Sequence, residues 1–101
     1  MKFYIAGKIT GEPNYKSKFK KAEDSLARLG HSIFNPAALG DYPEFTHEDY
    51  MYATKAMQMR CDAVLFLSDW TESVGAMKEY EQAKISGQEM YFDISDVPHA
   101  I

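Results

Sequence analysis

The chain has 101 residues, of which 46% are hydrophobic and 26% charged, and its formal net charge is −4. These values are typical of a globular protein, exclude a disordered, fibrous or disulfide-stabilised chain, and predict one domain over residues 1–101. The acidic balance leaves no basic surface for a phosphate backbone, so we expect no nucleic acid partner, although a small anion needs only one local cluster of donors.

The chain carries one cysteine, Cys61, and three histidines. A lone cysteine cannot form an internal disulfide, and neither a secretory signal nor a run of about 18 apolar residues is present. We therefore expect a cytoplasmic protein with no membrane partner. The histidines lack the spacing of metal ligands, so we expect no metal in the site, and no cofactor is predicted.

The first predicted elements are a strand at residues 2–7 and a helix at residues 15–29. The strand is apolar and is bounded by Gly7, and the loop after it is rich in turn residues. The helix has apolar residues at spacings of three and four, and Gly30 suits its C-terminal cap.

The rest of the chain alternates between short apolar strands and helices. Strands are expected at residues 31–36, 62–68 and 89–94. Helices are expected at residues 47–60, with Thr46 as N-cap, and at residues 76–86, before Gly87. Residues 37–46 form an irregular loop that is long for so small a domain, and loops of this length are often lids or binding segments.

Strands that alternate with helices predict right-handed βαβ crossovers. The expected fold class is therefore α/β, a small Rossmann-like or flavodoxin-like three-layer domain. Its parallel sheet of about four strands would be flanked by helices on both faces.

Two loops of this fold are expected to meet, namely residues 7–11 after the first strand and residues 69–75 after the third. Both leave the carboxyl edge of the sheet, where open α/β sheets bind their ligands. Together they supply the side chains of Lys8, Thr10, Asp69 and Ser73. With glycine N–H groups and the start of the following helix, these side chains suit an anion such as a phosphate. Neither loop matches a P-loop or a dinucleotide fingerprint.

Glu79 lies one turn into the helix expected at residues 76–86, close to the same edge. On spacing alone, a solvent-exposed carboxylate like that of Glu81 is the better interpretation. Held near Tyr4 of the first strand, the same carboxylate could act as a nucleophile or a base.

Four runs carry a resemblance to a known family: YIAGKITG, PNYKSKFKKAEDSLARLGHSIFNPA, CDAVLFLSDW and SVGAMKEYEQA. Their order and spacing resemble the nucleoside 2-deoxyribosyltransferase superfamily, most closely its small bacterial and phage branch designated as a domain of unknown function. The resemblance covers about residues 2–93. It implies a compact parallel α/β fold, a homodimer or larger homo-oligomer, and cleavage or exchange of the N-glycosidic bond of deoxynucleosides or their monophosphates.

The resemblance also implies roles for two residues. Glu79 occupies the place of the superfamily's nucleophilic glutamate, which attacks the anomeric carbon and forms a covalent glycosyl-enzyme. Tyr4 occupies the place of a tyrosine whose hydroxyl lies beside that glutamate. The implied chemistry has the two steps of a retaining glycosidase.

The position six residues before the nucleophile distinguishes substrates within the superfamily. Transferases that act on free nucleosides tend to have an acidic residue there, whereas this chain has Ser73, like the hydrolases of 5′-monophosphates. A hydroxyl with the Gly75 N–H tolerates a dianion that a carboxylate would repel. The turn after the first strand helps to hold the phosphate in those hydrolases, which implies binding roles for Gly7, Lys8, Ile9, Thr10 and Gly11. Many relatives have proline at the position of Lys8, so Lys8 is a first departure from the family pattern. The alternative interpretation of Lys8 is an ordinary solvent-exposed lysine in a loop.

A second departure from the superfamily concerns leaving-group activation. Its enzymes commonly carry an aspartate where this chain has Thr54, and that aspartate assists protonation of the leaving base or orients the nucleophile. A hydroxyl cannot replace a carboxylic acid in this role, so catalysis would require Asp49 or Asp69 instead.

Two further residues are candidate binding residues with structural alternatives. Asn35 could touch a sugar or a base, but asparagine before proline is also common in turns. Trp70 could form one wall of a base pocket, or pack onto a helix or a partner subunit.

The sequence thus predicts hydrolysis or deoxyribosyl transfer at a deoxynucleoside 5′-monophosphate through Glu79, with a small nucleotide or nucleoside as partner. One alternative is a catalytically silent nucleotide-binding domain, which Thr54 favours. The other is an interaction module that would use the aromatic loop at residues 42–45 as its partner surface.

Overall fold

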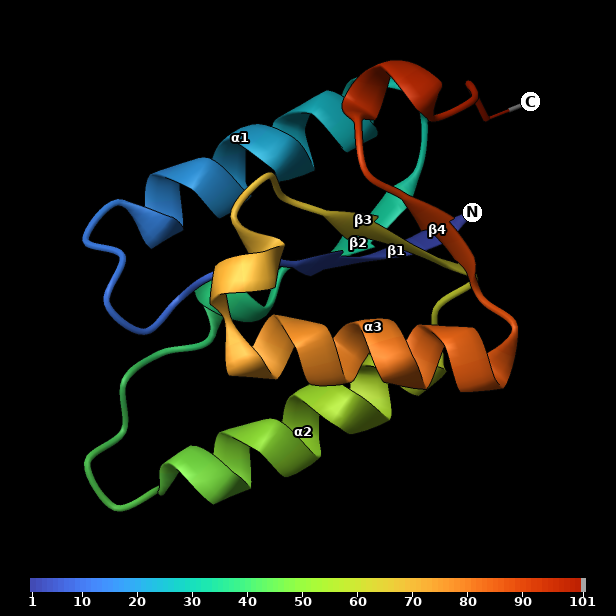
Figure 1. Cartoon of the computed structure of the whole chain (residues 1–101). Helices are drawn as coiled ribbons and strands as arrows, with labels where there is room; N and C mark the ends of the chain where they lie inside the picture. Colours follow the sequence, from blue (N-terminus) through green and yellow to red (C-terminus); the bar gives the residue numbers. More distant parts are fainter. Residues whose placement is uncertain (101) are drawn as a thin grey trace.

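The computed structural model describes residues 1–100 and contains a parallel sheet between two layers of helices (Figure 1). The strands are β1 (Lys2–Ala6), β2 (Ser32–Phe34), β3 (Ala63–Phe66) and β4 (Glu89–Tyr91). The α-helices are α1 (Tyr15–Arg28), α2 (His47–Met59) and α3 (Val74–Ser86), and short 3₁₀ turns are η1 (Pro36–Ala38), η2 (Trp70–Glu72) and η3 (Ile94–Asp96). This arrangement confirms the predicted α/β fold class.

The order of strands in the sheet is β2-β1-β3-β4, and every neighbouring pair is parallel. Tyr4 of β1 lies in register with Phe34 of β2 on one side and with Val64 of β3 on the other. The chain leaves β1 toward β2 and then crosses back to β3, so β1 and β3 flank the topological switch point. Doubly wound sheets bind ligands at the carboxyl edge of this point.

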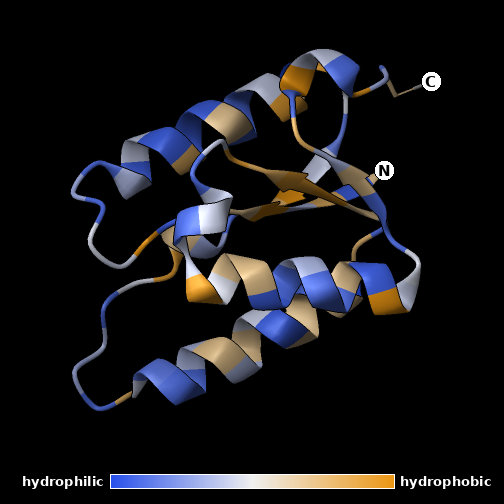
Figure 2. Ribbon diagram, in the orientation of Figure 1, coloured by the Kyte–Doolittle hydropathy of each residue, from blue (hydrophilic) through white to orange (hydrophobic). Residues whose placement is uncertain are grey.

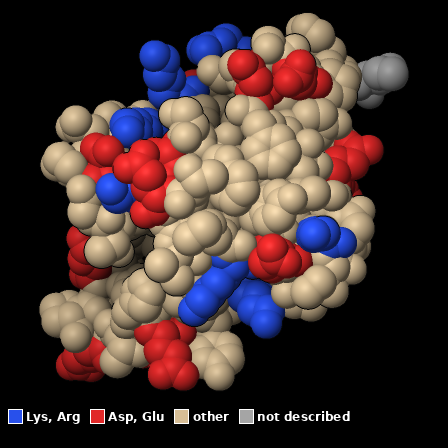
Figure 3. Space-filling model, viewed as in Figure 1, with Lys and Arg blue, Asp and Glu red and all other residues tan. Residues whose placement is uncertain are grey.

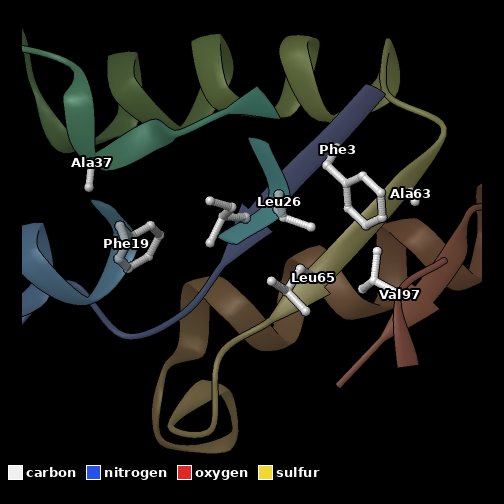
Figure 4. Packing of buried hydrophobic residues seen from close by; sticks show 8 residues of the cluster. Phe3, Phe19, Leu26, Ala37, Ala63, Leu65 and Val97 are labelled. Carbon is white, nitrogen blue, oxygen red and sulfur yellow. The ribbon is translucent and has the colours of Figure 1, made fainter. Parts of the chain in front are cut away.

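One face of the sheet packs against α1 and η3. The buried side chains of this layer include Phe3, Phe19, Leu26, Leu65 and Val97, which point toward one another in Figure 4. Fully burying a side chain of the size of Leu or Phe contributes about 1.5–3 kcal/mol, so this layer is a major source of stability.

The other face packs against α3, and α2 packs against α3 farther from the sheet (Figure 1). Tyr4, Ala6, Val64, Phe66 and Ala83 form its buried cluster. The two central strands are therefore buried on both faces, and Figure 2 shows them as apolar ribbons between more hydrophilic helices. Within residues 1–100, no helix has the length and apolar character that crossing a membrane requires.

The helix ends follow the local sequence. Thr46 forms a capping box with Asp49 at the start of α2, which confirms the predicted N-cap. Ser73 Oγ accepts the N–H of Ala76 at 3.1 Å, and because this cap satisfies the first turn, α3 begins two residues before the predicted start. Gly87 ends α3 in the left-handed conformation, as predicted.

Candidate active site

A cavity of about 790 Å³ opens at the carboxyl edge of β1 and β3. Its walls are the loop after β1, the segment from η1 to the first turns of α2, and the end of η2 with the first turns of α3. Figure 3 shows a hollow at the left of the molecule, with acidic and basic side chains interspersed over this face. The cavity thus lies at the switch point, where the strand order predicts a ligand.

Tyr4 and Glu79 meet at the floor of this cavity. Tyr4 is 1% exposed on β1, and its hydroxyl donates a hydrogen bond to Oε2 of Glu79 on α3. Burial raises the pKa of Glu79 to about 7, although the Tyr4 hydrogen bond acts in the lowering direction. Burial and the neighbouring Glu79 charge raise the pKa of Tyr4 above its usual range, so the phenol stays protonated as a donor.

This pair can perform nucleophilic or acid–base chemistry. A carboxyl group with a pKa of about 7 is roughly half ionised at neutral pH, so it can both attack and exchange protons. Tyr4 donates to Oε2, no hydrogen bond to Oε1 is found within residues 1–100, and Glu79 lines the cavity. The sequence alone favoured an exposed carboxylate at this position, and the half-buried environment comes from the packing of β1, α2 and α3.

The two loops that were expected to face each other are in contact. The backbone N–H of Lys8 donates to Oδ1 of Asp69 at 3.0 Å, and Nζ of Lys18 lies 3.3 Å from Oδ2 of the same carboxylate. A Cβ atom at Gly7 would lie 2.9 Å from Cδ1 and 3.1 Å from Cβ of Leu67, so a larger residue would require the Leu67 side chain to shift where the two loops approach each other. Asp69 therefore links the loop after β3 to the loop after β1, and these loops form two walls of the cavity.

Seven of the predicted site residues line the cavity: Tyr4, Gly7, Ile9, Thr10, Ser73, Gly75 and Glu79. Five do not line it, namely Lys8, Gly11, Asn35, Asp69 and Trp70. The ammonium group of Lys8 lies 3.6 Å from the carboxylate of Glu72, and Gly11 makes a turn at a φ of 80°.

Asn35 and Trp70 have structural contacts elsewhere. The Asn35 side chain accepts the N–H of Ala37 at 2.9 Å and donates to Glu23 at 3.0 Å. Trp70 stacks on Tyr80, with ring centroids 5.0 Å apart, and extends the aromatic packing of Phe66.

Thr54 lines the cavity from α2, and its hydroxyl donates to the carbonyl of Tyr50 at 2.9 Å. Asp49, one of two residues proposed to replace the missing acid, accepts the backbone N–H of Thr46 at 2.7 Å and does not line the cavity. Asp69 is held in the loop contact described above. Neither carboxylate lines the cavity.

The cavity is also lined by polar side chains, a histidine and four acidic or basic ones, that sequence reasoning did not select. These are Asp41, His47, Glu48, Glu72 and Lys78. For Asp41 the available signal was the length of the irregular segment before α2, which indicated a binding segment without indicating which of its side chains turn inward. The other four residues lie on α2, η2 and α3, where the local pattern carried no such signal. Among residues 1–100, no group of three or more His, Cys, Asp or Glu side chains is placed to hold a metal ion.

Comparisons with known proteins agree with this architecture. A 2-deoxyribosyltransferase from Bacillus psychrosaccharolyticus superposes with a TM-score of 0.70 at 21% sequence identity, over 89% of this chain and 69% of that chain. At this identity the likeness establishes a shared fold. No curated protein sequence matches the chain significantly. A sequence model described as "Domain of unknown function (DUF4406)" matches residues 1–92, and the chain therefore belongs to that family.

Proposed function

We propose that the protein cleaves the N-glycosidic bond of a deoxynucleoside 5′-monophosphate, with Glu79 as the nucleophile. The observation that carries the proposal is the Tyr4–Glu79 hydrogen bond at the floor of the cavity. A carboxylate held by a phenol at a switch point suits covalent glycosyl chemistry. The fold shared with a 2-deoxyribosyltransferase supports a nucleoside-like substrate over other glycosides.

The reaction has two balanced steps. In the first, Oε1 of Glu79 bonds to the anomeric carbon while the carbon–nitrogen bond breaks, and the base leaves with the bonding electrons and gains a proton. In the second, water or the nitrogen of another base attacks the same carbon, loses a proton and releases the carboxylate. Throughout, the Tyr4 hydroxyl holds Oε2 and so orients the other oxygen.

The phosphate is proposed to lie near the N-terminus of α3. Ser73 and Gly75 line the cavity there, and the first N–H groups of a helix attract anions. Thr10 contributes a hydroxyl from the opposite loop. Lys8 would contribute only by leaving its ion pair with Glu72, so we assign the phosphate mainly to backbone N–H groups and hydroxyls.

Protonation of the leaving base is assigned to Glu48. Glu48 in the first turn of α2 and Thr54 farther along the same helix both line the cavity. The Thr54 hydroxyl cannot protonate the base, because its proton is donated to the Tyr50 carbonyl. An alcohol is also far too weak an acid to act as a general acid near neutral pH. Glu48→Gln should lower kcat most for substrates whose base must be protonated in order to leave, and an unchanged kcat for those substrates would reject this assignment.

The reaction is tested by incubating the protein with a panel of deoxynucleosides and their 5′-monophosphates and measuring free base by chromatography. We expect release from at least one monophosphate, loss of release in Glu79→Gln, and normal release in the control Glu81→Gln, which changes an exposed carboxylate on the same helix. Release that persists in Glu79→Gln would reject Glu79 as the nucleophile.

A second candidate function is a silent nucleotide-binding domain, favoured by the hydroxyl of Thr54 in place of a carboxylic acid. It predicts a rise in the thermal unfolding midpoint with a monophosphate but no release of base. The two functions are separated by measuring both quantities on the same sample. Stabilisation without release in the wild type would favour the silent domain.

We further propose that the protein forms a homo-oligomer through the outer surface of α2 and the loop before it. Tyr52 is 71% exposed and Phe45 is 60% exposed, whereas the side chains that α2 buries are the polar ones of Thr54 and Gln58. Exposed aromatic groups beside a cavity are typical of subunit contacts. Sedimentation velocity should give a dimer or larger species, and Tyr52→Glu should shift it toward monomer.

A further inference from the structure

A buried amide pair joins α2 to α3 behind Glu79. The Gln58 side chain is 1% exposed, and its Nε2 donates a hydrogen bond of 2.8 Å to the backbone carbonyl of Glu79. In an α-helix this carbonyl also accepts the N–H four residues on, and its second lone pair is free for Gln58. The bond therefore anchors the backbone of the residue whose carboxyl group lies in the cavity.

Gln88 fixes the orientation of Gln58. Nε2 of Gln88 donates to the backbone carbonyl of Gln58 at 2.7 Å and to that of Cys61 at 2.8 Å. Oε1 of Gln88 lies 3.3 Å from Nε2 of Gln58 and accepts its second proton. Because each buried amide proton has a partner, the Gln58 side chain has one satisfied arrangement, and rotating it would leave a buried donor unpaired.

We infer that Gln58 is a positioning residue for the proposed reaction: it holds the turn of α3 that carries Glu79 at the depth where the Glu79 carboxyl group meets the Tyr4 hydroxyl. The effect of Gln58 on catalysis rests on the proposed function, whereas its effect on the position of Glu79 does not. Glu79 is held at two points, by Tyr4 of β1 through its side chain and by Gln58 of α2 through its backbone. Without the hydrogen bond from Gln58, the Glu79 backbone can shift, and its carboxyl group can move away from the Tyr4 hydroxyl.

The expected consequence is a change in how readily Glu79 ionises. The Tyr4 hydrogen bond lowers the pKa of Glu79, so a weaker bond raises that pKa. The other titratable groups in the same cavity are His47 and Glu48 of α2, Asp41 and Tyr50 near its start, Tyr15 of α1, Glu72 of η2 and Lys78 of α3. A smaller cavity between α2 and α3, which Glu79 and Gln58 also line, adds Tyr52 and Lys55 of α2. None of them touches Gln58 through a hydrogen bond found in residues 1–100, so exchanging Gln58 leaves their contacts in place.

The test uses Gln58→Met, which keeps the length of the side chain and removes its donor. The matched control is Gln82→Met, which removes an amide on α3 whose one side-chain hydrogen bond within residues 1–100 goes to Ser86 and is exposed to solvent. The ionisation of Glu79 is followed by NMR of carboxyl-labelled protein across pH 5–9, and kcat and KM are measured over the same range. We expect the Glu79 midpoint to rise in Gln58→Met, with kcat at pH 7 lower by about threefold to tenfold and KM changed little.

A merely structural role predicts a different pattern. A loss of folded protein lowers kcat equally at every pH and leaves the Glu79 midpoint unchanged, and that result in folded Gln58→Met would overturn the inference. If Gln58→Met does not fold, Gln88→Met is used instead, because it keeps the Gln58 amide and removes the Gln88 amide that orients it. An unchanged midpoint of the Glu79 titration in Gln88→Met would overturn the inference equally. The NMR titration needs no substrate, so a wild type without any glycosidase activity rejects the proposed function while this readout still decides the role of Gln58.

Discussion

Replacing Glu79 with glutamine should stabilise the protein at alkaline pH while it abolishes activity. Glutamine keeps an oxygen that accepts the Tyr4 hydroxyl, but it carries no charge to bury. The buried carboxyl of Glu79 has a pKa raised from 4.5 to about 7, so the folded protein binds its proton more tightly than the unfolded chain does. Stability from this group is therefore present below pH 4.5 and is lost as pH rises toward 7.

The size of the effect follows from that pKa difference. Each pKa unit corresponds to about 1.4 kcal/mol, so a rise from 4.5 to about 7 gives a limit of about 3 kcal/mol. The Glu79 side chain keeps partial contact with water, which screens its charge, and we therefore expect about 2 kcal/mol. The glutamine variant should be more stable than the wild type by this amount at pH 8, relative to the difference between them at pH 4.

Urea unfolding followed by circular dichroism at a series of pH values between 4 and 8 measures this difference. Groups common to both proteins cancel, so the pH dependence of the difference isolates Glu79. The control Glu81→Gln, at an exposed position of the same helix, should give a flat difference. A flat difference for Glu79→Gln as well would mean that Glu79 ionises as it does in water, and would refute the assignment of a desolvated nucleophile.

Two further predictions concern the cavity, and a third concerns the core between α1 and the sheet. Tyr4→Phe removes the donor that lowers the pKa of Glu79, so the acidic limb of the pH–rate profile should move to higher pH and kcat at pH 7 should fall about tenfold; an unmoved limb would contradict the pairing. Ser73→Asp keeps a helix cap but adds a charge, so kcat/KM should fall for monophosphates relative to nucleosides while thermal stability is retained. Leu26→Ala empties a fully buried position and should cost about 3 kcal/mol in urea unfolding, and a cost below about 1 kcal/mol would contradict the packing in Figure 4.

The sheet and its helices were predictable because their signals are local. Short apolar runs predicted each strand, with Gly7 and Pro36 marking the ends of the first two, and the alternation of strands and helices predicted the parallel order. The predicted strands were longer than those observed, since only three to five residues of each pair with a neighbour. The contact between the loops after β1 and β3 also followed from topology alone.

The directions of individual side chains were not predictable, because their partners are remote in the chain. Lys8 was expected to face an anion, and its ammonium group lies beside Glu72. Asn35 bonds to Glu23 on α1, and nothing in the local sequence indicates that contact.

The helix α2 illustrates the same limit. Its buried side chains are polar, so the usual apolar stripe does not reveal its inner face. The pairing of Gln58 with the Glu79 carbonyl and with Gln88 depends on three separate segments meeting. Such a network becomes visible only in the folded structure.

The most direct test of the central claim is to capture the covalent intermediate on Glu79. The protein is incubated with a deoxynucleoside 5′-monophosphate that carries fluorine at the 2′ carbon, which slows hydrolysis of the intermediate by disfavouring positive charge at the neighbouring anomeric carbon. The account predicts that the intact mass rises by one sugar phosphate and that peptide mapping places the addition on Glu79. Release of base without an adduct, or an adduct on any other residue, would contradict it.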